Sequence, residues 1–299
     1  MSPKVSVLIS TYNRPQFLAE ALASVVVQYF DDIEVIVRDD AGRPGEVEDV
    51  IRDVNDDRIV YRRNSSNVGV FATNAVLYNE ARGQYLAHLD DDDAWRPEFL
   101  ERMVAALDDN LDCGLAFAGS LTVDAHGTPL SERTRISNAK WGRVGLATGR
   151  HADGRRLAVV ARAVPASHSA VVRAETLDRE RLVNAKAGRA WDMYIAALSV
   201  RRTGWLWFDS QALSFYRWGH SDQMSGSSTR DETFEGLVWS LREFSNDPYF
   251  SAERSALLCQ LVKQEAYWSA HKLLRERRPT EAARHLGRAS RGLVTTAFG

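Results

Sequence analysis

The sequence of 299 residues predicts an α/β fold, with a mostly parallel central sheet flanked by helices and a helical C-terminal extension. Three observations lead to this prediction. Short β-branched runs alternate with segments of helical spacing through the first 120 residues, polar residues follow each run, and beyond about residue 231 the apolar spacing is helical only. Alternating strands and helices imply right-handed crossovers, which build parallel sheets covered by helices on both faces.

The first strand and the first helix are the most clearly marked. Residues 5–9 form a β-branched run, and the apolar residues between positions 17 and 26 recur at three- and four-residue intervals. Asn13 is a candidate N-cap and Pro15 suits the first turn of a helix. We therefore expect a helix at residues 15–28.

The other elements follow from the same periodicities. We expect strands at residues 33–37, 58–61, 84–89, 114–118, 169–173, 205–208 and 213–217, and helices at residues 46–54, 70–82, from Pro97 onward, 175–183 and 191–198.

Two segments lack the periodicity of regular elements. Residues 120–165 give a strand that runs into a turn and then no clear period, so we expect loop and short irregular elements there. Residues 221–229 are polar and rich in Gly and Ser, which is typical of a loop that acts as a lid.

Composition argues against several classes of function. A charged share of 26% and a net charge of −2, without a long basic run, give no reason to expect nucleic acid or an anionic membrane as partner. The N-terminus lacks the features of a signal peptide, and no apolar stretch approaches the roughly 20 residues that span a bilayer. We expect a soluble cytoplasmic protein with no transmembrane segment. Cys113 and Cys259 fit no metal or redox spacing and are expected to be buried free thiols.

Polar clusters follow the first four predicted strands. They are residues 10–14, the pair Asp39 and Asp40, residues 64–67 and the run 90–93. Because ligands of parallel sheets bind beyond the carboxyl ends of the strands, we expect these clusters to converge on one edge.

The run of four aspartates at 90–93 needs compensation by a cation or by water. Oxygen ligands suit Mg²⁺ or Mn²⁺, and such ions usually complete their shell with water and substrate phosphates. The alternative is a solvated acidic turn. No phosphate-binding loop of the Walker type and no G-x-G-x-x-G follows the first strand. The first loop instead offers Thr11, Tyr12 and Arg14: a hydroxyl, a ring for stacking and a cation for phosphate.

Four motifs in order make the chain similar to family 2 glycosyltransferases of the GT-A fold over about residues 4–220. They are VLISTYNR at 7–14, VIVRDDA at 35–41, NVG at 67–69 followed by Asn74, and GQYLAHLDDDD at 83–93. The resemblance implies a division into a nucleotide-sugar-binding half at 1–120, an acceptor-binding and catalytic half at 121–225 and a helical extension at 226–299.

The resemblance also implies roles for residues of the first half. Asp90 would face the ribose and Asp92 would ligate the metal, while the four consecutive aspartates leave the register open, so that Asp91 or Asp93 could supply a ligand. Asp39 would accept from the ring N–H of uracil or thymine. The remaining donor-side residues would be Thr11, Tyr12, Arg14, Asn67 and Asp91.

On the acceptor side, AWDMY at 190–194 resembles the acidic motif of the family, with Trp191 in place of its Glu. Asp192 would then be the general base; the alternative is a carboxylate that only stabilises the start of a helix. YRWGHS at 216–221 resembles the segment before a mobile loop, with one extra residue before His220. Arg217 would hold a phosphate and His220 would ligate the metal.

These residues predict an inverting, metal-dependent glycosyltransferase of the hexosyltransferase type that moves a sugar from a UDP- or TDP-sugar to a hydroxyl or amine. The acceptor would be a small molecule, glycan or lipid-linked molecule of bacterial natural-product or surface-glycan biosynthesis. The alternatives are a sugar-1-phosphate nucleotidyltransferase and a non-catalytic nucleotide-sugar-binding subunit. His168 and Trp141 are weaker candidates for the acceptor side, and the C-terminal helices could form a homodimer.

Overall fold

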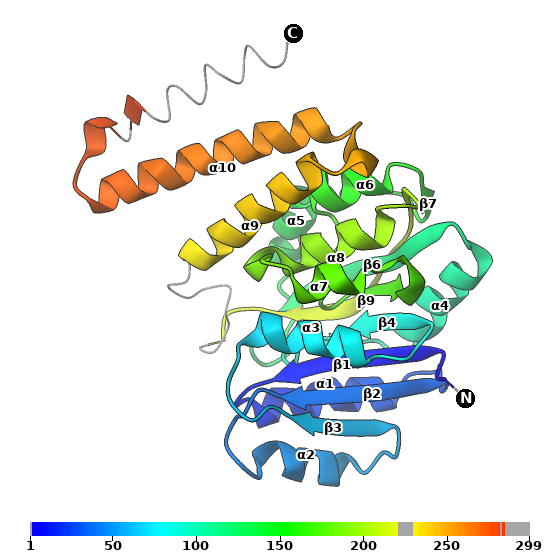
Figure 1. The fold of residues 1–299 in the computed structure, drawn as a ribbon. Helices are drawn as coiled ribbons and strands as arrows, with labels where there is room; N and C mark the ends of the chain where they lie inside the picture. Colours follow the sequence, from blue (N-terminus) through cyan, green and yellow to red (C-terminus); the bar gives the residue numbers. More distant parts are fainter. Residues whose placement is uncertain (1, 221–229, 282, 285–299) are drawn as a thin grey trace.

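The computed structural model describes residues 2–220, 230–281, 283 and 284 (Figure 1). The loop expected at residues 221–229 and the end of the predicted C-terminal helical segment lie outside these residues.

The N-terminal part of the sheet is wholly parallel, as expected. Its strands lie in the order β3-β2-β1-β4 and are paired in parallel throughout. The strands are β1 (Val5–Thr11), β2 (Ile33–Asp39), β3 (Ile59–Arg63) and β4 (Tyr85–His88).

Helices cover both faces of this parallel part because the strands alternate their apolar side chains between two cores. Val7 and Ile9 of β1 pack into one core with α1, α2 and α4, whereas Leu8 faces the other core with α3 and α8. The helices are α1 (Pro15–Val26), α2 (Glu46–Val54), α3 (Val70–Glu80), α4 (Phe99–Asp109) and α8 (Trp191–Val200). The helices predicted at these places are confirmed.

The second part of the sheet is mixed. The strands are β5 (Ala94–Trp95), β6 (Cys113–Val123), β7 (Gly149–His151), β8 (Ala170–Arg173) and β9 (Trp205–Arg217). Strand β8 lies antiparallel between β4 and β6, β6 and β9 are parallel, and β5 and β7 pair antiparallel with β9. The sheet is therefore wholly parallel up to β4 and mixed beyond it, where β6 and β9 form a further parallel pair.

The two strands expected at 205–208 and 213–217 are one strand, β9. Its register against β6 shifts beside Gly119, where Asp209 is followed by Ala212 as the next paired residue. A Cβ on Gly119 would lie 2.9 Å from the Gln211 carbonyl oxygen, so the bulge needs glycine opposite it. The polar break in the sequence thus marks a bulge and not the end of a strand.

The expectation of loop and irregular elements at residues 120–165 is wrong in one respect. The ten-residue helix α5 (Ser131–Lys140) lies there, followed by the short α6 (Gly154–Arg156) and a π-helical turn, Leu157–Ala161. No residue of α5 is buried, so the helix leaves no apolar period in the sequence. It is held to the end of β6 by Thr134, whose hydroxyl accepts from the Thr122 amide at 2.9 Å.

Two helix starts also differ from expectation. Pro15 begins α1 as predicted, but Arg14 occupies the N-cap position and no side chain caps the helix. Asn13 instead adopts a φ of 55°, and its side-chain oxygen accepts from the Arg43 amide at 2.8 Å. The helix expected at 175–183 is a 3₁₀ turn, Ala174–Thr176, and then α7 (Arg179–Val183), which Asp178 caps.

The C-terminal extension packs on the second half of the chain. Helices α9 (Arg230–Ser245) and α10 (Arg254–Arg275) lie at the end of the molecule opposite β3 and α2 (Figure 1). Tyr194 of α8 contacts Trp239 and Phe244 of α9, with ring centroids 5.3 Å apart in each pair. No helix in the described ranges is long and apolar enough to cross a membrane. A homodimer through these helices stays a prediction.

One carboxylate joins the extension to the domain. The Asp247 side chain is fully buried and accepts from Arg201 at 2.6 Å, from Arg181 at 2.8 Å and from the Tyr249 amide at 3.0 Å. Burial opposes its ionisation, but these hydrogen bonds outweigh that effect and hold the pKa of Asp247 below its ordinary value.

We expect Asp247→Ala to lower the free energy of unfolding by about 3 kcal/mol, because it leaves two arginines without their shared carboxylate. Urea denaturation measures the loss. The exposed pair of Arg52 with Asp49 offers a control, since Asp49→Ala should cost below about 1 kcal/mol. Folding lowers the pKa of Asp247. The difference in the free energy of unfolding between the wild type and Asp247→Ala should therefore be complete above about pH 5 and shrink as the pH falls through the lowered pKa. Equal losses for the two variants at neutral pH would contradict this role of Asp247.

Candidate active site

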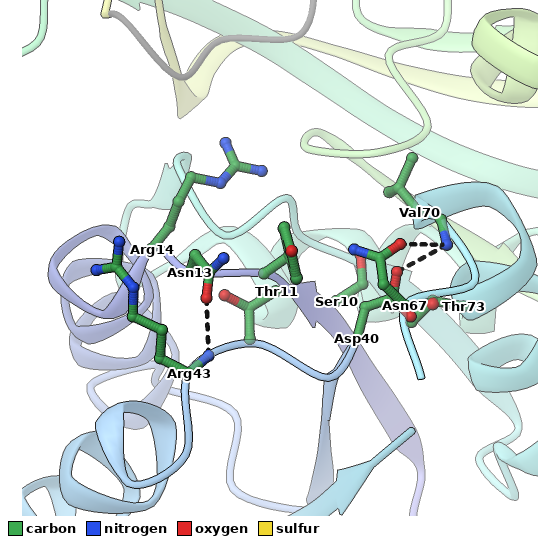
Figure 2. A pocket seen from close by; sticks show the side chains of 11 residues that line it. Ser10, Thr11, Asn13, Arg14, Asp40, Arg43, Asn67, Val70 and Thr73 are labelled. Atoms are coloured by element: carbon green, nitrogen blue, oxygen red, sulfur yellow. Dashed lines mark hydrogen bonds between the residues drawn. The ribbon is translucent and has the colours of Figure 1, made fainter. Parts of the chain in front are cut away.

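A cleft of about 600 Å³ lies at the carboxyl ends of the parallel strands (Figure 2). The loop after β1 forms one side of it, and the loop after β3 with the start of α3 forms another. The residues that line it are Ser10, Thr11, Tyr12, Asn13, Arg14, Asp40, Arg43, Asn67, Gly69, Val70 and Thr73. The cleft therefore gathers four of the predicted donor-side residues, Thr11, Tyr12, Arg14 and Asn67.

Asp40 fixes the far side of this cleft, a role that the sequence did not single out. Its carboxylate accepts from the Asn64 side-chain amide at 2.8 Å and from the Val68 and Gly69 amides at 2.9 and 2.8 Å. Gly69 has a φ of 86° at the N-cap of α3, a conformation that glycine adopts without strain. The carboxylate thus shapes the loop that leads into α3.

Asp39 does not line the cleft and lies beneath it. Its side chain is fully buried, forms an ion pair with Arg63, accepts from the Gly42 amide at 2.8 Å, and lies 3.3 Å from the Tyr61 hydroxyl. The structure thus places Asp39 where it supports the loop after β2. Its predicted contact with a base stays a prediction.

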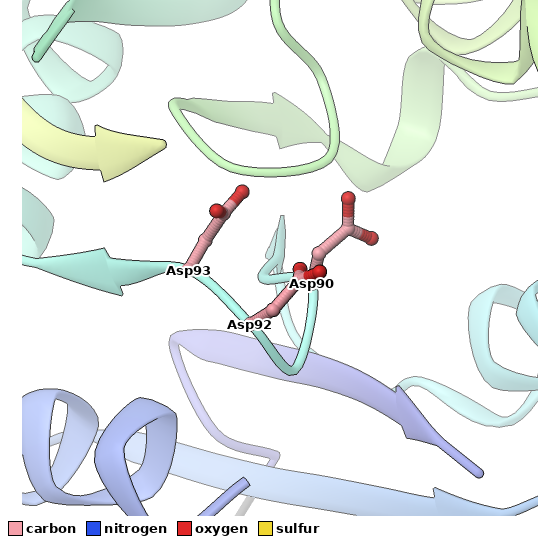
Figure 3. Close-up of side chains that lie close together, drawn as sticks. All are labelled: Asp90, Asp92 and Asp93. Atoms are coloured by element: carbon pink, nitrogen blue, oxygen red, sulfur yellow. The ribbon is translucent and has the colours of Figure 1, made fainter. Parts of the chain in front are cut away.

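The four aspartates form a tight turn between β4 and β5. The Asp93 amide donates to the Asp90 carbonyl at 3.1 Å. Carboxylate oxygens of Asp90, Asp92 and Asp93 all lie within 4.8 Å of one another, and Figure 3 shows the three side chains on this one turn. Asp91 lies outside that group and pairs with Arg14 at 2.9 Å. Three of the four carboxylates are thus clustered and Asp91 faces Arg14, while the register of metal ligation among the four stays a prediction.

Basic side chains from two distant segments meet Asp92. Arg14 donates to one Asp92 oxygen at 2.8 Å, and His220 Nε2 lies 3.0 Å from the same oxygen. Arg217 is buried and holds the turn from the other side: its Nε donates to the Asp92 carbonyl at 2.9 Å and its amide donates to Asp93 at 2.8 Å. Arg217 also bonds to Glu20 and to the Ala125 carbonyl, so in this structure it positions the turn.

The electrostatics of the turn fit a cation. Burial, only partly offset by Arg14, raises the pKa of Asp91 to about 7. Burial and then repulsion by Asp92 and Asp90 raise the pKa of Asp93 well above its ordinary value. Asp93 Oδ2 is buried and accepts no hydrogen bond from any residue in the described part of the chain. Clustered oxygens with an unused buried acceptor suit Mg²⁺ or Mn²⁺.

Asp192 lies in the first turn of α8, next to the acidic turn. It does not cap its own helix: its side chain accepts from the Ser167 amide at 2.8 Å, and Ser167 in turn accepts from the Asp90 amide at 2.9 Å. Burial raises the pKa of Asp192, while the hydrogen bonds from Ser167 and the charge of Arg143 offset part of that rise. A carboxylate with a raised pKa is a stronger base than an ordinary one.

Of the two weaker acceptor-side candidates, only His168 is shown to lie near the acidic turn. His168 is buried, stacks on Tyr216 with ring centroids 5.0 Å apart, and its Nδ1 lies 3.7 Å from Asp93. Burial lowers the pKa of His168 to about 3, so its ring is neutral. Trp141 follows α5 and has the cations of Lys140 and Arg162 over its ring.

The fold is that of GT-A glycosyltransferases. The structure superimposes on a crystal structure of TarS from S. aureus in complex with UDP-GlcNAc with a TM-score of 0.69. The match covers 98% of this chain and 81% of the TarS chain in that structure, residues 1–349, at 18% sequence identity, which defines the fold alone.

Residues 6–158, about half of the chain, match the family model described as glycosyl transferase family 2. The chain belongs to this family. It is 34% identical over 133 residues to the uncharacterized glycosyltransferase MJ1057 of Methanocaldococcus jannaschii, a match that covers 44% of this chain and 46% of that protein. It is 29% identical over 143 residues to a GalNAc(5)-diNAcBac-PP-undecaprenol beta-1,3-glucosyltransferase of Campylobacter jejuni, covering 45% and 46%. The chain thus spans about half the length of these curated relatives.

We expect Asp40→Ala to lower the free energy of unfolding by about 2–3 kcal/mol, because two backbone amides and the Asn64 amide lose their acceptor. Asn67→Ala in the same loop is the matched control: it removes one bond, to the Gly69 amide at 3.1 Å from an exposed side chain, and should cost below about 1 kcal/mol. Thermal melting followed by circular dichroism measures both. If the two variants melt alike, Asp40 does not organise the loop.

Proposed function

We propose that the protein is an inverting, metal-dependent glycosyltransferase that moves a sugar from a UDP- or TDP-sugar to a hydroxyl or amine of an acceptor. One observation carries the proposal: the acidic turn is bonded through Arg14 to the cleft on one side and through Ser167 to Asp192 on the other. Family membership favours sugar transfer over the two alternative functions.

The donor would occupy the cleft. Tyr12 is 44% exposed and offers a ring on which a base can stack, while Arg14 and Arg43 supply positive charge for phosphates. The complex of TarS with UDP-GlcNAc supports a uridine nucleotide as the donor carrier. The named activity of the Campylobacter jejuni relative supports a lipid-linked glycan as acceptor and surface-glycan biosynthesis as the context.

Asp90, Asp92 and Asp93, with His220, would hold a Mg²⁺ or Mn²⁺ ion. When bound, the ion would offset the negative charge that develops on the leaving diphosphate. Arg14 fixes Asp92 and neutralises Asp91, and Arg217 holds the backbone of the turn, so that the carboxylates keep one arrangement. Beside Asp93, the buried His168 is held by the Trp95 indole, which donates to the His168 carbonyl at 2.8 Å.

Asp192 would act as the general base. As the acceptor oxygen forms its bond to the anomeric carbon, the bond from that carbon to the diphosphate oxygen breaks and its electron pair leaves with the diphosphate. The acceptor proton passes to Asp192. Attack from the side opposite the leaving group inverts the anomeric configuration. This route needs the base and the leaving diphosphate on opposite faces of the sugar, and Asp192 and the cleft lie on two sides of the acidic turn.

We expect UDP to bind in the presence of Mn²⁺ and to bind at least about tenfold more weakly in Asp92→Ala, since a metal ligand and the partner of Arg14 are lost. Isothermal titration calorimetry with and without Mn²⁺ measures this. Asp57→Ala, an exposed carboxylate before β3, is a control for net charge and should leave binding unchanged. UDP affinity that is the same without metal and in Asp92→Ala would refute the metal assignment.

We expect Asp192→Asn to reduce kcat for transfer by about 100-fold or more while UDP affinity stays the same, because the amide cannot take a proton but can still accept from Ser167. A coupled assay of released UDP measures kcat, and calorimetry measures UDP binding. Asn184→Asp, an exposed amide outside the site, serves as the charge control. Turnover that survives in Asp192→Asn would remove this residue as the base.

A further inference from the structure

Arg143 and Arg162 are partly buried arginines, and Arg143 lies close enough to Asp192 for its charge to act on that carboxylate. Arg143 donates from Nε to the Ala163 carbonyl at 2.7 Å, and no carboxylate of the described chain lies within 4 Å of its guanidinium or of that of Arg162. Arg38 and Arg201, by contrast, pair with Glu80 and Asp247. Withdrawal from water without such a partner lowers the pKa of Arg143 to about 10 and also lowers the pKa of Arg162.

The two arginines come from chain segments that pack against each other. The segment after α5 lies against the segment after the π-helical turn: Arg143 bonds to Ala163, and the Arg162 guanidinium lies over the Trp141 ring at 5.2 Å. Arg162 follows the π-helical turn with a φ of 53°, a left-handed conformation that is costly for a residue other than glycine. Its buried Nε has no hydrogen-bond partner among the described residues.

This place adjoins the reacting side of the site. The charge of Arg143 lowers the pKa of both Asp192 and His168, and His168 in turn neighbours Asp93. The chain from Arg162 runs through Ala163 to Ser167, whose amide holds Asp192. An acceptor whose hydroxyl meets Asp192 would therefore extend toward Arg143 and Arg162.

The geometry points to an acceptor that carries a phosphate group, bound by Arg143 and Arg162 with Lys140 at the rim, next to the hydroxyl that Asp192 deprotonates. The inference rests on the proposed function and specifies its acceptor. Guanidinium groups match phosphate oxygens through paired N–H bonds, and an anion supplies the charge that the protein does not. Lys140 and Arg162 lie over the Trp141 ring and Arg143 bonds to the residue after Arg162, and this number of positive charges favours phosphate over a carboxylate, which carries a single charge.

Three ligands that differ only at carbon 6 test the inference: glucose 6-phosphate, glucuronate and glucose. Binding to the full chain is measured by saturation-transfer NMR with UDP and Mg²⁺ present, so that the donor cleft is filled. We expect glucose 6-phosphate to bind at least about tenfold more tightly than glucose and more tightly than glucuronate. Equal binding of the phosphate and the neutral sugar, or of the phosphate and the carboxylate, overturns the assignment.

Variants locate the site. Arg143→Met and Arg162→Met should each weaken glucose 6-phosphate at least about fivefold, and Arg143→Lys should restore part of the binding. Arg135→Met in α5 removes the same charge from an exposed pair with Glu132 and should have no effect. Unchanged binding in both methionine variants overturns the inference, and if one variant does not fold, the other decides. UDP affinity in the same samples reports separately on the proposed function.

Discussion

A turn of four aspartates, two of them buried, can form only where cations and hydrogen-bond donors meet the carboxylates, and this requirement organises the site. Arg14 comes from the end of β1, and Arg217 comes from the end of β9, far along the same sheet. Arg14 neutralises Asp91 and Asp92 from the cleft, whereas Arg217 holds the backbone of the turn from behind. The acidic turn therefore joins the end of β1, in the parallel part of the sheet, to the end of β9, in the mixed part.

A single residue then links the turn to the opposite side of the site. Ser167 accepts from the Asp90 amide through its carbonyl and donates its own amide to Asp192. Backbone groups hold position more firmly than side chains, because they lose no rotamer freedom. Strand β8 begins three residues later and lies between β4 and β6, so the sheet itself sets the spacing between the clustered carboxylates and the proposed base.

The sequence predicts the structure well where buried strands and the helices between them follow one another along the chain. Strands β1 and β2 are buried on both faces, so their apolar runs and the helical spacing between them indicate the same layers, and the convergence of polar strand ends follows from parallel geometry. Helix α5 buries no residue, so no apolar periodicity in the sequence marks it. The position of β8 between β4 and β6 depends on pairing with strands that are distant in the sequence, so the local sequence does not predict it. The contrast between Asp40 in the cleft and Asp39 beneath it also arises only from tertiary contacts.

The C-terminal extension contacts two segments that border the proposed acceptor site. Gln260 of α10 donates to the Val160 carbonyl of the π-helical turn at 3.0 Å, next to the point where the chain turns back over Trp141. Gly236 of α9 lies so close to the Ala187 carbonyl that a Cβ on this glycine would be 2.0 Å from the carbonyl oxygen. Helix α9 thus packs directly against the segment that precedes α8 and Asp192. A π-helical turn and a left-handed arginine are costly unless neighbours hold them. Gln260 supplies one such contact to the π-helical turn, so the extension would help to shape the place that we propose for the acceptor.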